Sequence, residues 1–177
     1  ISDAVWGNIA QVSSRKVVNG YQEILLPNGK IGYVPAKDIK PLQKWLDSRN
    51  PTPDNIINTG KQFLGFPYLW AGTSIKGLDC SGFVKTSHFL NGIILRRDAS
   101  QQAKIGQEID ITNGIENLQK GDILFFGRKA TADRPARVTH VGMYIGDGSF
   151  IHSATFVKIN NLVPGTPVNY VAKVLDG

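Results

Sequence analysis

Three prolines fall within thirteen residues, from Pro41 to Pro53, in a chain of 177 residues. Proline lacks a backbone N–H and fixes φ, so we expect no helix or strand to run through this stretch. Short strand patterns come before the stretch, and helical patterns followed by strand patterns come after it. We therefore predict a small module at residues 1–42, a linker at 43–53 and a larger domain at 54–177.

The first module has no helical pattern of useful length, and an Asn28-Gly29 pair lies between two of its apolar runs. Such a pair is typical of a tight hairpin. The run Lys30-Ile31-Gly32-Tyr33-Val34-Pro35-Ala36, with a short turn up to Ile39, resembles part of a bacterial SH3-like module. We therefore predict a small all-β SH3-like barrel. Such modules resemble wall-binding or substrate-gating units, and a packing role without a ligand is the alternative.

The larger domain begins with helical patterns and ends with strand patterns. Helices are predicted from Asp54, from Cys80 to about Leu90, and over a short segment capped by Asp98. The later segments predicted as strands are Ile123–Phe126, Val138–Ile145, Phe150–His152 and Val168–Leu175. Helices followed by an antiparallel sheet indicate an α+β fold.

Composition narrows the functional classes. Hydrophobic residues make up 41% of the chain and charged residues 19%, which suits a packed domain. No apolar run has the roughly 18 residues that span a membrane. The net charge of +6 suits an anionic partner, but no RNA-binding signature accompanies it, so nucleic acid is not expected. The chain begins at Ile1, so we expect a processed or trimmed sequence whose targeting segment is not visible.

Cys80 is the only cysteine, which rules out an internal disulfide and disfavours a Cys-rich zinc site. We expect no metal and no cofactor. Asp79 is a good N-cap residue, so Cys80 is predicted at the first position of a helix. The partial positive charge and free N–H groups of a helix start stabilise a thiolate, which is the nucleophilic form. Our hypothesis is that Cys80 is a catalytic nucleophile, and a buried packing residue is the alternative.

A nucleophilic cysteine needs a base, and three histidines are present. His88 lies two helical turns from Cys80, about 12 Å along the axis, so a structural role is expected. His140 lies in a predicted strand, in which successive side chains point to opposite faces. His140 and Gly142 therefore share one face, and Val141 lies on the other. A histidine on a face lined by glycine is well placed to meet a helix end lying across the sheet. Packing is the alternative role for His140.

The register of the next hairpin decides where His152 points. A loop of two or four residues within 146–149 would turn His152 away from His140. A three-residue loop with a left-handed Gly148 would place His152 opposite Gly142 or Tyr144, on the His140 face. We predict the three-residue loop, with His152 orienting His140.

Four segments together resemble the NlpC family of bacterial cell-wall cysteine peptidases, which have a papain-like fold. They span about residues 67–152 in compatible order. The segments are Pro67-Tyr68-Leu69-Trp70-Ala71-Gly72, Asp79-Cys80-Ser81-Gly82-Phe83-Val84, Gly121-Asp122-Ile123-Leu124-Phe125-Phe126, and Thr139-His140-Val141-Gly142-Met143-Tyr144-Ile145-Gly146 with Phe150-Ile151-His152. The resemblance implies hydrolysis of the bond between γ-D-glutamate and a diamino acid in peptidoglycan stem peptides.

The resemblance also implies roles for single residues. Cys80 attacks the amide carbonyl, His140 acts as general base and then general acid, and His152 holds the His140 ring. The backbone N–H of Cys80 and the Tyr68 hydroxyl help to bind the oxyanion; a core aromatic is the alternative for Tyr68. Asp79 and Ser81 correspond to substrate-contacting positions.

A preceding SH3-like module resembles the branch of dipeptidyl-peptidases that act on released peptides with a free L-alanine amine. In that branch an acidic residue in an Arg-Asp step anchors the amine some eighteen residues past the cysteine, and Arg97-Asp98 stands there. A plain helix cap is the alternative for Asp98. This branch tends to carry a further SH3-like module, and only one is found here. The polar loop from Arg128 to Arg137 either steers substrate carboxylates toward His140 or is simply solvated.

These resemblances favour a monomeric enzyme of the bacterial cell envelope, periplasmic or secreted, that acts on murein tripeptide or tetrapeptide. Three other functions stay open. The chain is alternatively a CHAP-type wall amidase, a non-catalytic cell-wall-binding protein with a relic site, or an acyltransferase. The order of Cys before His disfavours the circularly rearranged acyltransferases.

Overall fold

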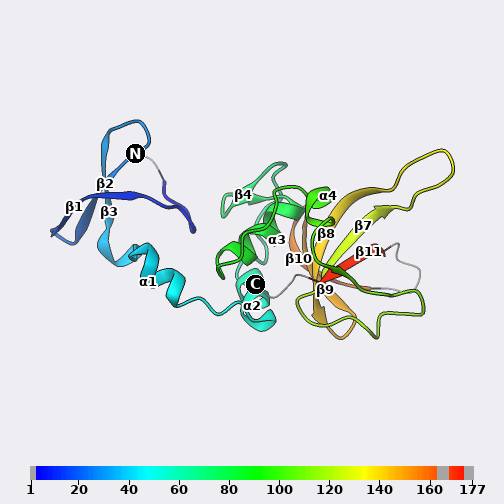
Figure 1. The fold of residues 1–177 in the computed structure, drawn as a ribbon. Helices are drawn as coiled ribbons and strands as arrows, with labels where there is room; N and C mark the ends of the chain where they lie inside the picture. The colour runs from blue at the N-terminus through cyan, green and yellow to red at the C-terminus, as the bar shows by residue number, and fades with distance from the viewer. Residues whose placement is uncertain (1–2, 163–167, 174–177) are drawn as a thin grey trace. The chain divides into compact units, whose positions relative to one another are not determined.

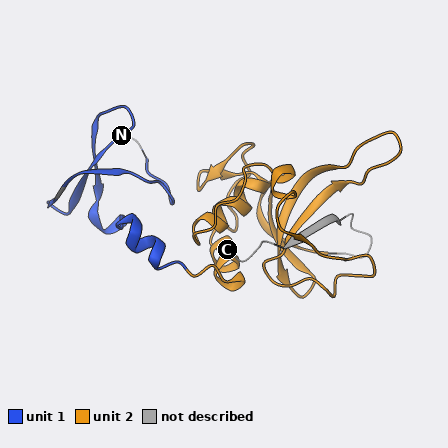
Figure 2. Ribbon diagram, in the orientation of Figure 1, with its two compact units in different colours: residues 1–49 blue, residues 50–177 orange. Residues whose placement is uncertain are grey.

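The computed structural model describes residues 3–162 and 168–173. The chain divides into two compact units, residues 1–49 and residues 50–177, so the division falls inside the predicted linker (Figure 2).

The first unit is a three-stranded antiparallel meander in the order β1-β2-β3. The strands are β1 (Gln11–Val18), β2 (Tyr21–Leu25) and β3 (Ile31–Pro35). The hairpin predicted at Asn28-Gly29 is confirmed, because β2 and β3 pair on either side of it. A 3-10 turn, η1 (Ala36–Asp38), follows where a short turn is predicted. The three strands are observed, and their membership of an SH3-like barrel stays a prediction.

A short helix, α1 (Leu42–Asp47), occupies the first part of the predicted linker. This helix lies between Pro41 and Pro51, so no element runs through the prolines, as expected. Pro41 stands at the N-cap position, where its missing N–H costs nothing, and the helix ends before Pro51.

In the described part of the second unit, the helices α2 (Pro53–Lys61), α3 (Cys80–Phe89) and α4 (Ala99–Gln102) precede the main sheet (Figure 1). Thr52 caps α2 by accepting a hydrogen bond from the Asn55 N–H at 3.3 Å, and Pro53 occupies the first turn. Helices at these three places are as predicted. In the described part of the chain, every helix is too short or too polar to cross a membrane.

Within residues 3–162 and 168–173, the main sheet has six strands in the order β10-β9-β8-β7-β11-β6. Its strands are β6 (Gln107–Glu108), β7 (Ile123–Arg128), β8 (Arg137–Gly146), β9 (Ser149–Ala154), β10 (Phe156–Asn161) and β11 (Val168–Lys173). A separate two-stranded ribbon joins β4 (Thr73–Ser74) to β5 (Gly77–Leu78). The last strand is predicted to reach Leu175, and its final two residues lie outside the described residues.

The two faces of the sheet carry different clusters. On one face Val141 and Met143 pack with Phe83 of α3 and Ile57 of α2 in the main core. The other face carries a second cluster built around Leu124, Tyr144 and Phe150.

The body of α3 packs on the Val141 face of β8, and a meeting of its first residue with His140 stays a prediction. Alternation along β8 puts Val141 in the main core, and the His140 ring lies instead beside Phe126, with 5.7 Å between ring centroids. The helix packs where the apolar side chains of β8 are. Gly142 serves a different purpose, because a Cβ there would come within 3.1 Å of the His152 Cβ. A glycine opposite His152 therefore leaves room for its side chain.

The β8–β9 hairpin puts His152 on the predicted face of the sheet, but its loop differs from the predicted one. Its loop has two residues, Asp147 and Gly148, both with positive φ, between the paired residues Gly146 and Ser149. The predicted three-residue loop is therefore wrong. A bulge between Tyr144 and Gly146 supplies the extra residue and shifts the register.

Candidate active site

Cys80 is the first residue of α3, as predicted. Asp79 caps the helix, since its Oδ1 accepts a hydrogen bond from the Gly82 N–H at 2.6 Å. The thiol is buried, with 9% of the residue exposed, and it lies against the backbone of Val141. Burial raises the pKa of Cys80, and the Asp79 charge adds to this, while nearby backbone N–H groups only partly oppose it. The expectation of a thiolate stabilised by the helix start is therefore corrected: an uncharged thiol is favoured, and a base must take its proton.

His140 and His152 form a direct pair. The Nε2 of His140 lies 2.6 Å from the Nδ1 of His152, and the two rings meet edge to face with 4.9 Å between centroids. If His140 donates through Nε2, its other ring nitrogen, Nδ1, has a free lone pair. His152 then carries its proton on Nε2, which is buried and has no hydrogen-bond partner within the described residues. The arrangement leaves His140 able to accept one proton through Nδ1.

Both histidines favour the uncharged form. Burial lowers the pKa of His140 to about 4, and the charges of His152 and Lys158 act in the same direction. Burial also lowers the pKa of His152, and the Asn160 side chain is near enough to oppose this. At neutral pH His140 is therefore an uncharged base.

The thiol and the histidine pair lie near the same point of β8. Cys80 contacts the backbone at Val141, and His140 is the preceding residue. Among residues 3–162, no hydrogen bond joins the thiol to His140. Hydrogen bonds between a nucleophile and its base are often long before substrate binds and tighten in the complex. The pairing of Cys80 with His140 stays a prediction.

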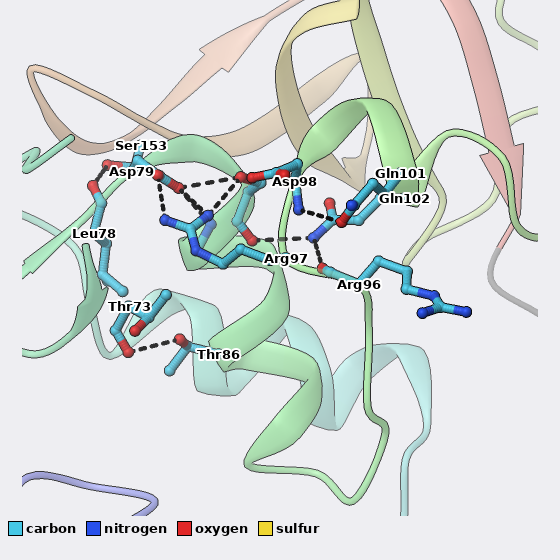
Figure 3. A network of polar contacts seen from close by, with 12 residues as sticks. Thr73, Leu78, Asp79, Thr86, Arg96, Arg97, Asp98, Gln101, Gln102 and Ser153 are labelled. Atoms are coloured by element: carbon cyan, nitrogen blue, oxygen red, sulfur yellow. Dashed lines mark hydrogen bonds and ion pairs between the residues drawn. The ribbon is translucent and has the colours of Figure 1, made fainter. Parts of the chain in front are cut away.

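A polar cluster surrounds the helix start (Figure 3). Arg97 donates to Asp79 through both terminal nitrogens, at 2.6 Å to Oδ2 and 3.2 Å to Oδ1. It also donates to the Ser81 Oγ at 3.0 Å. Ser81 in turn donates to the Asp79 Oδ1 at 3.2 Å. Asp79 and Ser81, predicted beside the substrate, are thus held in fixed positions next to the thiol.

Asp98 and Tyr68 lie at the edge of this cluster. Asp98 is exposed and caps α4 in a capping box with Gln101, so the cap predicted as its alternative role is observed (Figure 3). Tyr68 has 36% of its surface exposed. Burial raises the pKa of Tyr68, followed by the charges of Cys80 and Asp79, which places its hydroxyl within electrostatic range of both. Neither placement tests the predicted binding roles.

His88 lies outside the site, as expected from its distance along α3. It is buried at 1% exposure, and its Nδ1 lies 2.8 Å from the Val84 carbonyl oxygen. This local bond and the surrounding core explain why His88 occurs in the helix.

Three residues near the site have no role in the sequence-based prediction. Arg97 holds Asp79, Gln102 donates to the Ser81 carbonyl oxygen at 3.2 Å, and Lys158 stands opposite His152 in the β9–β10 ladder. The resemblance assigns a role to Asp98 of the Arg-Asp step but none to Arg97. The sequence pattern predicts no strand at β10, which carries Lys158. In the described part of the chain, no group of three or more His, Cys, Asp or Glu side chains could hold a metal ion.

Comparison with known proteins decides the family. The model of the NlpC/P60 family matches residues 65–174, which include the thiol, the histidine pair and the polar cluster. The chain belongs to the NlpC/P60 family. This confirms the family predicted from the four segments, and with it an α+β, papain-like fold.

Individual relatives agree with this assignment. The chain is 41% identical over 148 residues to a γ-D-glutamyl-L-lysine dipeptidyl-peptidase of Bacillus cereus, covering 84% of this chain and 42% of the relative. A protein of the same name in Bacillus subtilis is 37% identical over 135 residues, covering 76% and 42%. A crystal structure of an NlpC/P60 family protein from Bacillus cereus matches with a TM-score of 0.71 and 38% identity, over 91% of this chain and 52% of that one. The chain thus spans about two fifths of the length of these curated relatives.

Proposed function

We propose that the protein is a cysteine peptidase that hydrolyses the bond between γ-D-glutamate and a diamino acid in peptidoglycan stem peptides. The observation that carries the proposal is the 2.6 Å pairing of His140 with His152, one residue from the point where the Cys80 thiol contacts β8. The names of the two Bacillus relatives, both γ-D-glutamyl-L-lysine dipeptidyl-peptidases, support the substrate class.

The proposed reaction begins with transfer of the thiol proton to His140. The uncharged imidazole takes this proton as the sulfur attacks the γ-carbonyl carbon. The N–H of Cys80, which has no intrahelical partner, and the Tyr68 hydroxyl stabilise the oxyanion. His140 then gives its proton to the departing amine, and water hydrolyses the thioester by the same base. His152 keeps the His140 ring in the orientation that this sequence requires.

We further propose that the substrate is a released peptide with a free N-terminal L-alanine, such as murein tripeptide or tetrapeptide. Asp79 is paired with Arg97, so these two formal charges offset one another. The exposed carboxylate of Asp98 adds a negative charge beside them. The three groups together carry a net charge of −1, which suits an ammonium group.

The remaining predictions belong to the same proposal. A monomer in the bacterial cell envelope, periplasmic or secreted, would encounter peptides of this kind during wall turnover. An SH3-like module at residues 1–42 would bind wall material or limit which peptides reach the site.

The test is digestion of L-Ala-γ-D-Glu-L-Lys, with the amine either free or acetylated, followed by mass spectrometry. The wild type is expected to release L-Ala-D-Glu and lysine, and Cys80→Ala is expected to release nothing. Without cleavage of either peptide by the wild type, the peptidase proposal fails. Release of the lactyl end from intact muropeptides would instead indicate a CHAP-type amidase.

A single substitution isolates the amine anchor. Asn caps a helix about as well as Asp, so Asp98→Asn removes the charge and keeps the cap of α4. The wild type is expected to prefer the free amine by about tenfold or more, and Asp98→Asn to lose that preference. Equal cleavage of free and acetylated peptides by the wild type would refute the anchor while leaving the peptidase intact.

A further inference from the structure

A pocket of about 510 Å³ lies beside His140, and neither Cys80 nor Val141 lines it. Its walls include His140, the aromatic rings of Phe126 and Phe150, and two cationic residues, Arg128 and Arg137. The two rings are in contact, with 5.2 Å between their centroids, and Phe126 also contacts the His140 ring. The pocket therefore combines an apolar wall, the proposed base and two positive charges.

A β-bulge places the second arginine there. Phe126 pairs with His140, but Gly127 pairs with Val138, so Thr139 is an extra residue in β8. In a regular strand, residues three apart point to opposite faces. The extra residue restores Arg137 to the His140 face, while Val138 packs against the main core.

The bulge depends on glycine at position 127. A Cβ there would collide with the Arg137 carbonyl oxygen, because the two strands approach closely at this point. Arg128 and Arg137 then stand directly opposite one another in the ladder. They lie two residues, or about 7 Å, beyond the Phe126–His140 pair.

Both guanidinium groups are available to a ligand. Arg128 and Arg137 are exposed, and among residues 3–162 and 168–173 neither forms an ion pair. Arg128 makes one long hydrogen bond, at 3.3 Å to the Pro135 carbonyl oxygen. Two like charges opposite one another in a ladder destabilise the free protein, and an anion between them removes that cost.

We propose that this pocket binds the leaving part of the substrate, with Arg128 and Arg137 pairing with its carboxylate. The inference rests on the proposed function, in which His140 protonates the departing amine. The group attached to that amine must therefore lie beside His140, where the pocket opens. Its alkyl side chain packs on Phe126 and Phe150, and its carboxylate lies two residues farther along β7, between the arginines. The ligand class is a carboxylate-bearing amino acid or dipeptide with a long alkyl side chain.

The test compares two peptides that differ only at the leaving end, L-Ala-γ-D-Glu-L-Lys with a free carboxylate and the same peptide as its carboxamide. The variant is Arg128→Gln with Arg137→Gln. The control, Lys129→Gln with Arg134→Gln, removes the same number of charges from the same loop, at residues that do not line the pocket. All three proteins are used as the full chain, and kcat/KM is measured for each peptide.

The wild type and the control are expected to prefer the carboxylate by about tenfold or more, the range of charge-assisted pairs. The arginine variant is expected to lose that preference, through a fall on the carboxylate peptide and a change of less than about twofold on the carboxamide. The inference is overturned if the wild type cleaves both peptides equally. It also fails if the variant loses both activities in parallel, or if the control falls as far. Cleavage of neither peptide by the wild type would overturn the proposed function first, and this inference with it.

Discussion

Arg97 holds Asp79 with a hydrogen bond of 2.6 Å from Nη2 to Oδ2, across eighteen residues of sequence. Asp79 uses its other oxygen, Oδ1, to cap α3 at the Gly82 N–H. One carboxylate thus connects the helix start that carries Cys80 to the segment that carries Asp98. The placement of the thiol depends on an arginine that would not touch the reacting atoms.

Arg97→Gln is expected to destabilise the fold by about 2 kcal/mol, because it leaves the Asp79 carboxylate partly buried without its cation. The value is moderate because the Arg97 side chain is 32% exposed. Arg96→Gln is the control, since Arg96 is exposed and its backbone carbonyl, not its side chain, contacts Gln102. Urea unfolding at pH 7 gives the free energies. Equal stability of the two variants would show that the ion pair contributes nothing.

Removing the partner of His140 is expected to slow the reaction more than it weakens binding. His152→Ala leaves the His140 ring without its 2.6 Å contact, so kcat should fall by about a hundredfold or more with little change in KM. His152→Asn offers an oxygen that can accept from Nε2, and should recover part of the lost rate. A variant series in which KM rises and kcat stays constant would assign His152 to substrate binding instead.

The pH profile follows from the electrostatics of the pair. His140 must be uncharged to accept the thiol proton, and its pKa is lowered to about 4, mainly by burial. Activity should therefore be retained as pH falls through 6.5 and be lost only as pH approaches 4, as measured by kcat/KM.

Lys158 offers a test of whether nearby positive charge lowers the pKa of the histidine pair. It stands opposite His152 in the ladder, and its charge lowers the pKa of both histidines. Lys158→Gln removes that charge, so the acid limb of kcat/KM should move to higher pH. Lys104→Gln, an exposed control away from the pair, should leave the limb unchanged. A downward shift in Lys158→Gln would contradict the electrostatic account.

Local signals in the sequence predict the helix starts well, because caps act within one turn. Residue type alone predicts Asp79 and Asp98 at N-caps, and the structure has them there. The family motifs bring Cys80, His140 and His152 together in a prediction because each carries its own chemical signature. The face occupied by His152 was predicted correctly, although the loop length used to derive it was wrong.

Other features depend on contacts that no local pattern reveals. The predicted hairpin has three loop residues and no bulge, whereas the observed one has two loop residues and a bulge in β8 before Gly146. Both arrangements put His152 on the same face of the sheet. In Phe156–Asn161, the edge strand that carries Lys158, Val157 is the only buried residue, so the segment lacks a repeating apolar face from which to predict it. Burial of Cys80 reverses the expected effect of the helix start on its pKa, and burial is a property of the packed domain.

The pH dependence of stability offers a last prediction, centred on His88. Burial lowers the pKa of His88 to about 4 from its ordinary value of 6.5, so the folded state binds fewer protons than the unfolded state between these values. Stability should therefore fall as pH drops below 6.5 and level off below 4. From pH 7 to pH 5 the loss attributable to His88 is about 2 kcal/mol.

His88→Gln isolates that contribution, because the amide stays uncharged and can still donate to the Val84 carbonyl oxygen. The variant is expected to be less stable at pH 7, since the side chain fits the core imperfectly, but to lose about 2 kcal/mol less than the wild type on going to pH 5. Urea unfolding at both pH values measures the difference, in which the other histidines cancel. Parallel losses in the two proteins would mean that His88 is charged in the folded state, which its burial at 1% exposure opposes.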